Sequence, residues 1–210
     1  RTRILRRPYR STYPIARCAY DLVRSDGDLQ ALLKKDGDEL IEPDLDHSLM
    51  RQGEKPKLVK CSNLEAELDY VAHGVKQLIS DGYWPSEIAV LALRQEEGQQ
   101  RFAAYLRAQG IPIVLASECR YSSEGPRTLV GLISGITGQE FRAVFVCELQ
   151  DLFRRDSTAF SGSWIEFKAQ QNRLLYVAMT RARDTLHMCY RQNLHSTLNC
   201  LEKTTKMESV

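Results

Sequence analysis

The fold follows from residues 57–93, which read KLVKCSNLEAELDYVAHGVKQLISDGYWPSEIAVLAL. Lys57–Cys61 alternates like a strand, and Ile88–Leu93 is a continuous apolar run, as expected for a strand buried on both faces. Ser62-x-x-Glu65 predicts a capping box at the start of a helix between them, and Gly82 predicts its end. The apolar residues of that helix share one stripe: Leu64, Leu68, Val71, Ala72, Val75, Leu78 and Ile79. The stretch therefore predicts a βαβ unit.

The same alternation continues on both sides of this unit. Further strands are expected at Thr2–Arg7, Pro112–Ala116, Thr128–Ile133, Ala143–Leu149 and Thr185–Tyr190, and further helices at Thr12–Arg24, Gln95–Gln109 and Glu166–Arg183. Strands separated by amphipathic helices predict an α/β domain with a mainly parallel β-sheet and helices on both faces. Such sheets bind ligands beyond the carboxyl ends of their strands, so we expect the chemistry in loops that follow strands.

The chain divides into one domain at residues 1–190 and a polar tail at 191–210, which we expect to be frayed. Residues 24–56 interrupt the domain as an irregular acidic excursion, and 150–165 form a polar loop. Residues 26–46 of the excursion carry eight acidic residues, a pattern typical of a solvated face: Asp26, Asp28, Asp36, Asp38, Glu39, Glu42, Asp44 and Asp46. Their Asp-Gly-Asp steps suggest turns but lack the spacing of a calcium loop.

The composition is that of an ordinary globular protein, with 43% hydrophobic and 27% charged residues among 210. No apolar stretch approaches a membrane span, and no signal peptide is visible, so we expect a cytoplasmic protein without a membrane partner. The six cysteines form no C-x-x-C pair, which predicts buried free thiols and no metal site. The net charge of +2 is too small to indicate nucleic-acid binding by itself.

Three clusters carry residues suited to chemistry. The first is Tyr176-Val177-Ala178-Met179-Thr180-Arg181-Ala182-Arg183, on a helix that we expect to be mostly buried. A buried Arg181 needs a polar partner, and a guanidinium suits bidentate contact with phosphate. A structural salt bridge to a nearby carboxylate is the alternative.

The other two clusters are Pro8-Tyr9-Arg10-Ser11-Thr12 and Gly138-Gln139-Glu140-Phe141. Arg10 stands at a strand-to-helix turn, where Ser11 or Thr12 can cap the helix and Tyr9 can stack on a planar ring. An ordinary cap with a surface arginine is the alternative. Glu140 can accept a hydrogen bond from a sugar hydroxyl, or be a solvated turn carboxylate.

In order and composition, the three clusters resemble motifs IV, V and VI of UvrD/Rep-type superfamily 1 helicases. Leu174-Leu175-Tyr176-Val177-Ala178-Met179-Thr180-Arg181-Ala182 resembles the sixth motif, L-x-Y-V-A-x-T-R-A, almost letter for letter. Residues 8–12 resemble the fourth motif, N-Y-R-S. The fifth, H-S-x-K-G-L-E-F, is matched at Gly138, Glu140 and Phe141. The resemblance spans residues 3–190 and implies the second RecA-like motor domain, with no P-loop in this chain.

The resemblance implies an ATP-dependent DNA helicase or translocase in which two RecA-like domains clamp one ATP. Arg10 and Arg181 are the expected arginine fingers, Tyr9 stacks on the adenine, and Gly138 and Glu140 bind the nucleotide. The N-terminal motor domain is the expected partner and carries the Walker lysine and the Mg²⁺ ligands. Single-stranded DNA is the expected strand, with RNA left open. The fragment alone is expected to be inactive.

Three positions depart from the fifth motif. Ser134, Gly135 and Thr137 stand where the family has His, Ser and Lys. The resemblance implies that this stretch couples ATP to the nucleic acid, so Ser134 and Thr137 are the candidates for strand coupling. The competing interpretations are a non-catalytic interaction module on a degenerate helicase scaffold and an unrelated nucleotide-binding α/β domain.

Overall fold

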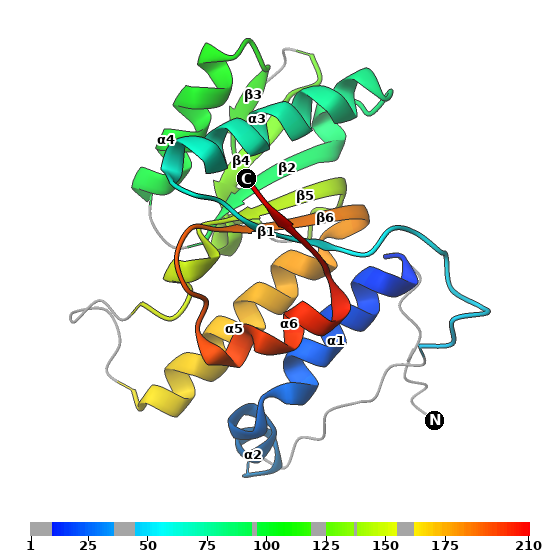
Figure 1. Cartoon of the computed structure of the whole chain (residues 1–210), viewed down its shortest axis with the longest axis vertical. Coiled ribbons are helices and arrows are strands. Elements are labelled where there is room, and N and C mark those ends of the chain that lie inside the picture. Colours follow the sequence, from blue (N-terminus) through cyan, green and yellow to red (C-terminus); the bar gives the residue numbers. More distant parts are fainter. Residues whose placement is uncertain (1–9, 36–44, 94–95, 119–124, 137, 155–161) are drawn as a thin grey trace.

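A seven-stranded sheet forms the centre of the molecule, with the strand order β3-β4-β2-β5-β6-β1-β7 and every pair parallel (Figure 1). The computed structural model describes residues 10–35, 45–93, 96–118, 125–136, 138–154 and 162–210. Its strands are β1 (Lys57–Lys60), β2 (Ile88–Ala92), β3 (Ile113–Leu115), β4 (Thr128–Leu132), β5 (Phe141–Cys147), β6 (Ala182–Tyr190) and β7 (Lys206–Ser209). The parallel α/β prediction is confirmed, while the strand expected at Thr2–Arg7 lies outside the described residues.

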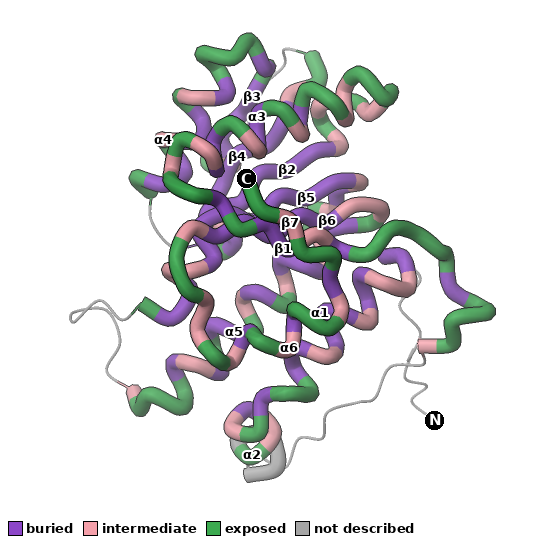
Figure 2. Tube along the Cα trace, viewed as in Figure 1, coloured by how far each residue is buried: buried purple, intermediate pink, exposed green. Residues whose placement is uncertain are grey.

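Helices cover both faces of the sheet, as predicted. They are α1 (Tyr13–Ser25), α2 (Gly27–Lys35), α3 (Leu64–Ser80), α4 (Glu96–Ala108), α5 (Trp164–Thr180) and α6 (Asn199–Thr204). Figure 1 shows α3 and α4 on one face and α1, α5 and α6 on the other. Alternate strand residues enter the two cores, so that Phe145 packs under α3 and α4 while Val144 and Val146 pack under α1 and α5. Figure 2 shows β2 and most of β5 buried.

Local signals fix where the helices begin and end. The N-cap of α3 is Asn63, whose side chain accepts a hydrogen bond from the Ala66 amide at 2.9 Å, so the predicted Ser62 cap is wrong by one residue. Gly82 has a φ of +92° just beyond that helix, and the expected end is confirmed. Ser163 and Glu166 form a reciprocal capping box that starts α5 earlier than predicted.

The chain turns from helix to strand earlier than the sequence suggested at the end of α5. Arg181 is the C-cap of α5, and β6 already begins at Ala182. Arg183 therefore lies in a strand, and its expected helical position is wrong. The reason is tertiary: the carbonyl of Arg181 accepts from the Phe141 amide at 2.9 Å, and that of Arg183 accepts from the Thr12 amide at 3.1 Å.

The expectation of a frayed tail at 191–210 is also wrong. A short 3-10 turn (Ser196–Leu198) leads into α6, and β7 then pairs with β1 at the edge of the sheet. Leu198 and Leu201 are fully buried against α1 and the sheet. Leu194, Leu198 and Leu201 have helical spacing, and that signal could have identified the segment.

The acidic excursion contains a helix where we expected irregular chain. Asp26 is 2% exposed, and one of its carboxylate oxygens accepts from the amides of Asp28 and Leu29 at the start of α2. Its other oxygen accepts from the Asn172 side chain of α5 at 2.5 Å. A solvated face is therefore the wrong description for Asp26, because it joins α2 to α5. Residues 36–44 of the excursion lie outside the described residues.

Candidate functional site

Arg10, Glu140 and Arg181 lie at the amino edge of the sheet, the end at which its parallel strands begin. The opposite end, at which the strands finish, is called the carboxyl edge. Glu140 directly precedes β5, Arg181 directly precedes β6, and the first residues of these strands, Phe141 and Ala182, are register partners. Our expectation that the chemistry follows the carboxyl ends of strands is wrong for all three. For Glu140 and Arg181 the cause is the chain direction, since each directly precedes a strand.

The guanidinium of Arg10 pairs with the carboxylate of Glu140 at 2.6 Å. The Arg10 side chain is 73% exposed and that of Glu140 26% exposed, so the pair lies at the surface. The structure thus brings two of the candidate residues into direct contact, although they lie far apart in the sequence. Tyr9 lies outside the described residues.

Arg181 contacts Gln139, the residue before Glu140. One terminal nitrogen of its guanidinium donates to the Gln139 carbonyl at 3.3 Å, while its Nε is buried without a hydrogen-bond partner. Among the described residues, no carboxylate forms a salt bridge with Arg181. The structural salt bridge that we considered for Arg181 is therefore not formed with the described residues. Arg181 is half-buried, and a guanidinium with an unused donor is suited to an incoming anion.

The turn that carries Arg10 is tied to the start of β6. The Ser11 hydroxyl donates to the Ala182 carbonyl at 2.8 Å, and the Thr12 amide donates to the Arg183 carbonyl. Both side chains are buried. Thr12 is the N-cap of α1 but makes no side-chain cap, and its hydroxyl has no hydrogen-bond partner. Thr12 therefore occupies the predicted cap position without the expected side-chain bond, because Ser11 bonds to β6 and Thr12 bonds through its backbone.

The segment between β4 and β5 crosses from one edge of the sheet to the other. Ser134 follows the carboxyl end of β4, in a 3-10 turn at Ile133–Gly135, whereas Glu140 precedes the amino end of β5. Ile133 and Ile136 are buried along the way in the core beneath α1 and α5. Gly138 is exposed with a φ of +76°, which favours glycine. Thr137 lies outside the described residues.

Ser134 is therefore not part of the amino-edge site. It lines a cavity of about 360 Å³ with residues at the start of α4 and the ends of β3 and β4: Glu96, Gln99, Gln100, Ala116, Ser117, Leu132 and Gly135. Both Ser134 and Gly135 are exposed there.

A cluster of charged residues that the sequence did not indicate lies at the carboxyl edge. Glu67 of α3 is fully buried; it accepts from the Glu148 amide at 2.7 Å and pairs with Arg191 at 2.9 Å. Arg191 also pairs with the Glu148 carboxylate at 3.1 Å. Burial raises the pKa of Glu67 to about 7 against the opposing effects of the Glu148 amide and Arg191. Glu148 has a φ of +61°, an unusual value for a residue other than glycine. The cluster joins α3 to the ends of β5 and β6.

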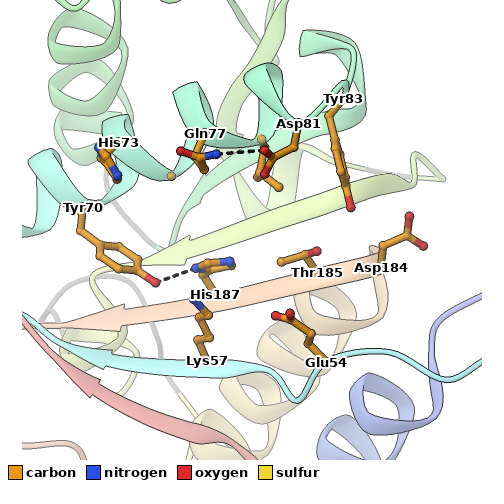
Figure 3. A pocket seen from close by; sticks show the side chains of 12 residues that line it. Glu54, Lys57, Tyr70, His73, Gln77, Asp81, Tyr83, Asp184, Thr185 and His187 are labelled. Atoms are coloured by element: carbon orange, nitrogen blue, oxygen red, sulfur yellow. Dashed lines mark hydrogen bonds between the residues drawn. The ribbon is translucent and has the colours of Figure 1, made fainter.

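A groove of about 540 Å³ runs between α3 and β6 (Figure 3). The Tyr70 hydroxyl and the His187 Nδ1 are hydrogen-bonded at 2.7 Å across it. Asp184 and Thr185 line its end nearest the amino edge. Burial, together with the charge of Lys57, lowers the pKa of His187 to about 3. The imidazole is therefore neutral at physiological pH.

This neutral histidine predicts acid sensitivity. The pKa of His187 lies below its unfolded value of about 6.5, so its contribution to stability is complete above that pH and is lost as pH falls toward 3. The free energy of unfolding should drop by about 2 kcal/mol between pH 7 and pH 5 from this group. Urea unfolding at both pH values should show that His187→Gln removes most of this drop. His73→Gln, at an exposed position in the same groove, should retain it; an unchanged drop in His187→Gln would contradict the assignment.

The part of the chain that the structure describes contains neither a metal-binding cluster nor a membrane-spanning helix. No group of three or more His, Cys, Asp or Glu residues there could hold a metal ion. The described cysteines are free thiols, and Cys18, Cys61, Cys147 and Cys189 are buried as expected. No helix in the described ranges is long and apolar enough to cross a bilayer.

The parallel sheet with helices on both faces has the RecA-like architecture of helicase C-terminal domains. A family model for the UvrD-like helicase C-terminal domain matches residues 4–123, which is more than half of the chain. The chain belongs to that family. The match ends before residues 174–182. The resemblance of that segment to the sixth motif is therefore a separate indication of the same family.

Solved structures agree on the fold. The C-terminal domain of a possible DNA helicase from Lactobacillus plantarum WCFS1 has a TM-score of 0.65 at 18% identity, covering 95% of this chain and 98% of that one. S. cerevisiae Dbp5, in a complex that includes ADP, has a TM-score of 0.51 at 9% identity, covering 95% of this chain and 52% of that one. No curated protein sequence matches the chain. These identities establish the fold alone.

Proposed function

We propose that this chain is the second motor domain of an ATP-dependent DNA helicase or translocase, and that its amino edge closes an ATP pocket against an N-terminal motor domain. The observation that carries the proposal is the convergence of Arg10, Glu140 and Arg181 on one short stretch of backbone. Two guanidinium groups beside one carboxylate suit a ligand with several phosphates and a sugar. The metal ligands and the phosphate-binding lysine belong to the other domain.

Arg181 contacts the terminal phosphate in this proposal. Among the residues that the structure describes, its buried Nε has no hydrogen-bond partner, and its terminal nitrogen makes a long hydrogen bond to the Gln139 carbonyl. A phosphate oxygen offers better acceptors, so the guanidinium gains hydrogen bonds when the two domains close. A positive charge at that point stabilises the charge that develops on the transferred phosphoryl group.

Arg10 exchanges one anion for another on closure. Exposed ion pairs are worth about 0–1 kcal/mol, so breaking the contact with Glu140 costs little. Once Arg10 moves to phosphate, the Glu140 carboxylate is free to accept a ribose hydroxyl. The Arg10–Glu140 pair therefore serves as a resting arrangement for both residues.

The crossing segment at 133–140 is the proposed link between ATP and nucleic acid. One end carries Glu140 at the amino edge, and the other carries Ser134 at the carboxyl edge. A shift of Glu140 on nucleotide binding is transmitted to Ser134 through the buried Ile136. Single-stranded DNA bound at the carboxyl edge gains most of its affinity from phosphate contacts and base stacking.

The experiment is reconstitution of ATP hydrolysis. The isolated chain should not hydrolyse ATP, and the N-terminal motor domain alone should be nearly inactive. Together, as one polypeptide, they should show turnover that single-stranded DNA stimulates. If the N-terminal domain hydrolysed ATP equally well without this chain, the non-catalytic interaction module would replace the motor assignment.

A further inference from the structure

Three consecutive residues of the Arg10 turn are attached to three consecutive residues of β6. Ser11 bonds to Ala182, and Thr12 bonds to Arg183, as described above. The third attachment runs through Arg51. One nitrogen of its guanidinium donates to the Arg10 carbonyl at 3.4 Å, and the other pairs with the Asp184 carboxylate.

Arg51 contacts the Arg10 turn through both its side chain and its backbone. Besides the side-chain contact to the Arg10 carbonyl, its own carbonyl accepts from the Tyr13 amide at 2.8 Å. Gly53, two residues on, lies so close to Thr12 that an added Cβ would meet the Thr12 methyl group at 2.6 Å. The loop that carries Arg51 therefore packs directly against the turn that carries Arg10.

Asp184 lies between two guanidinium groups. Its second oxygen accepts from the Nε of Arg142 in β5 at 2.8 Å, and Arg142 also lies 4.0 Å from the centre of the Tyr83 ring. Burial acts to raise the pKa of Asp184, but the hydrogen bonds and charges of Arg142 and Arg51 outweigh it and lower that pKa. Asp184 is thus a fixed negative charge at the end of the groove in Figure 3 nearest the amino edge.

We infer that Asp184 is a positioning residue for Arg10. It holds Arg51 against the backbone of the Arg10 turn and so fixes the backbone position from which the Arg10 side chain extends. The inference rests on the proposed function for its consequence in ATP turnover. The mechanical link itself is independent of ATP. Because Arg142 binds the other oxygen, Asp184 cannot rotate freely, and the position of Arg51 is set relative to β5 and β6.

The test begins with amide hydrogen exchange in the complete protein without nucleotide. Asp184→Asn should speed exchange at Tyr13 about tenfold, the effect expected for losing one hydrogen bond to a charged group, with little change in α3. Asp81→Asn is the matched control, since Asp81 lines the same groove but its bond is to Gln77. Arg51→Gln removes the same link at a half-exposed side chain and replaces Asp184→Asn if that variant does not fold.

Turnover then separates positioning from general stability. If Asp184 acts through Arg10, Asp184→Asn should lower kcat for ATP more than it changes KM, and adding it to Arg10→Ala should cause no further loss. Unchanged exchange at Tyr13, or an additive loss in the double variant, would overturn the inference. If Arg10→Ala itself left turnover intact, the proposed function would fail instead, and the exchange result would still decide the link.

Discussion

Replacing Arg181 with alanine in the complete motor should reduce ATP turnover by about 10³–10⁵-fold, the range typical of arginine fingers. Nucleotide affinity should change far less, because Arg181 contributes mainly when charge develops on the transferred phosphoryl group. The measurement is steady-state ATP hydrolysis with single-stranded DNA, together with nucleotide affinity on the same samples.

Two further variants make this result specific. Arg181→Lys should recover little activity, because an ammonium cannot reproduce the planar fork of a guanidinium. Arg173→Ala, at an exposed position on the same helix, should keep turnover near the starting level. If Arg181→Ala hydrolysed ATP normally, the arginine-finger role would be excluded.

The second large effect concerns the buried cluster at the carboxyl edge. Glu67→Ala should destabilise the fold by about 3–5 kcal/mol, because it leaves the Glu148 amide without its acceptor and Arg191 without its most buried partner. Glu67→Gln should cost much less, since the amide oxygen still accepts from Glu148. The pKa of about 7 at Glu67 supports this difference, because burial already disfavours the negative charge there.

Denaturant unfolding of the two variants tests this expectation. The free energy of unfolding should fall sharply for Glu67→Ala and modestly for Glu67→Gln, with similar dependence on denaturant. Equal losses for both would mean that the charge of Glu67, and not its role as an acceptor, holds α3 to the ends of β5 and β6.

Local signals in the sequence were sufficient to predict the βαβ unit and the parallel sheet. Ile88–Leu93 could only be a buried strand, and Gly82 stopped α3 where expected. The pattern at 174–182, through its resemblance to the sixth motif, singled out Arg181 as a candidate. These features depend on neighbours in the sequence, so the sequence could reveal them.

Features that depend on distant partners could not be predicted in the same way. The strand β7 is short and mostly exposed on both faces, and it exists because β1 supplies its hydrogen bonds. Glu67 appears as one more acidic residue of an amphipathic helix until Arg191 is brought beside it. The candidate site lies at the amino edge because Glu140 and Arg181 directly precede strands. Composition and periodicity do not show this order.

In the proposed function, the nucleotide binds at the amino edge of this domain. A structure of the complete protein with a non-hydrolysable ATP analogue tests it most directly. We predict guanidinium nitrogens of both Arg181 and Arg10 at about 3 Å from oxygens of the terminal phosphate, with Glu140 released from Arg10 and facing the ribose. Phosphates bound instead at the carboxyl edge, beside Glu148 and Arg191, would exclude this binding site.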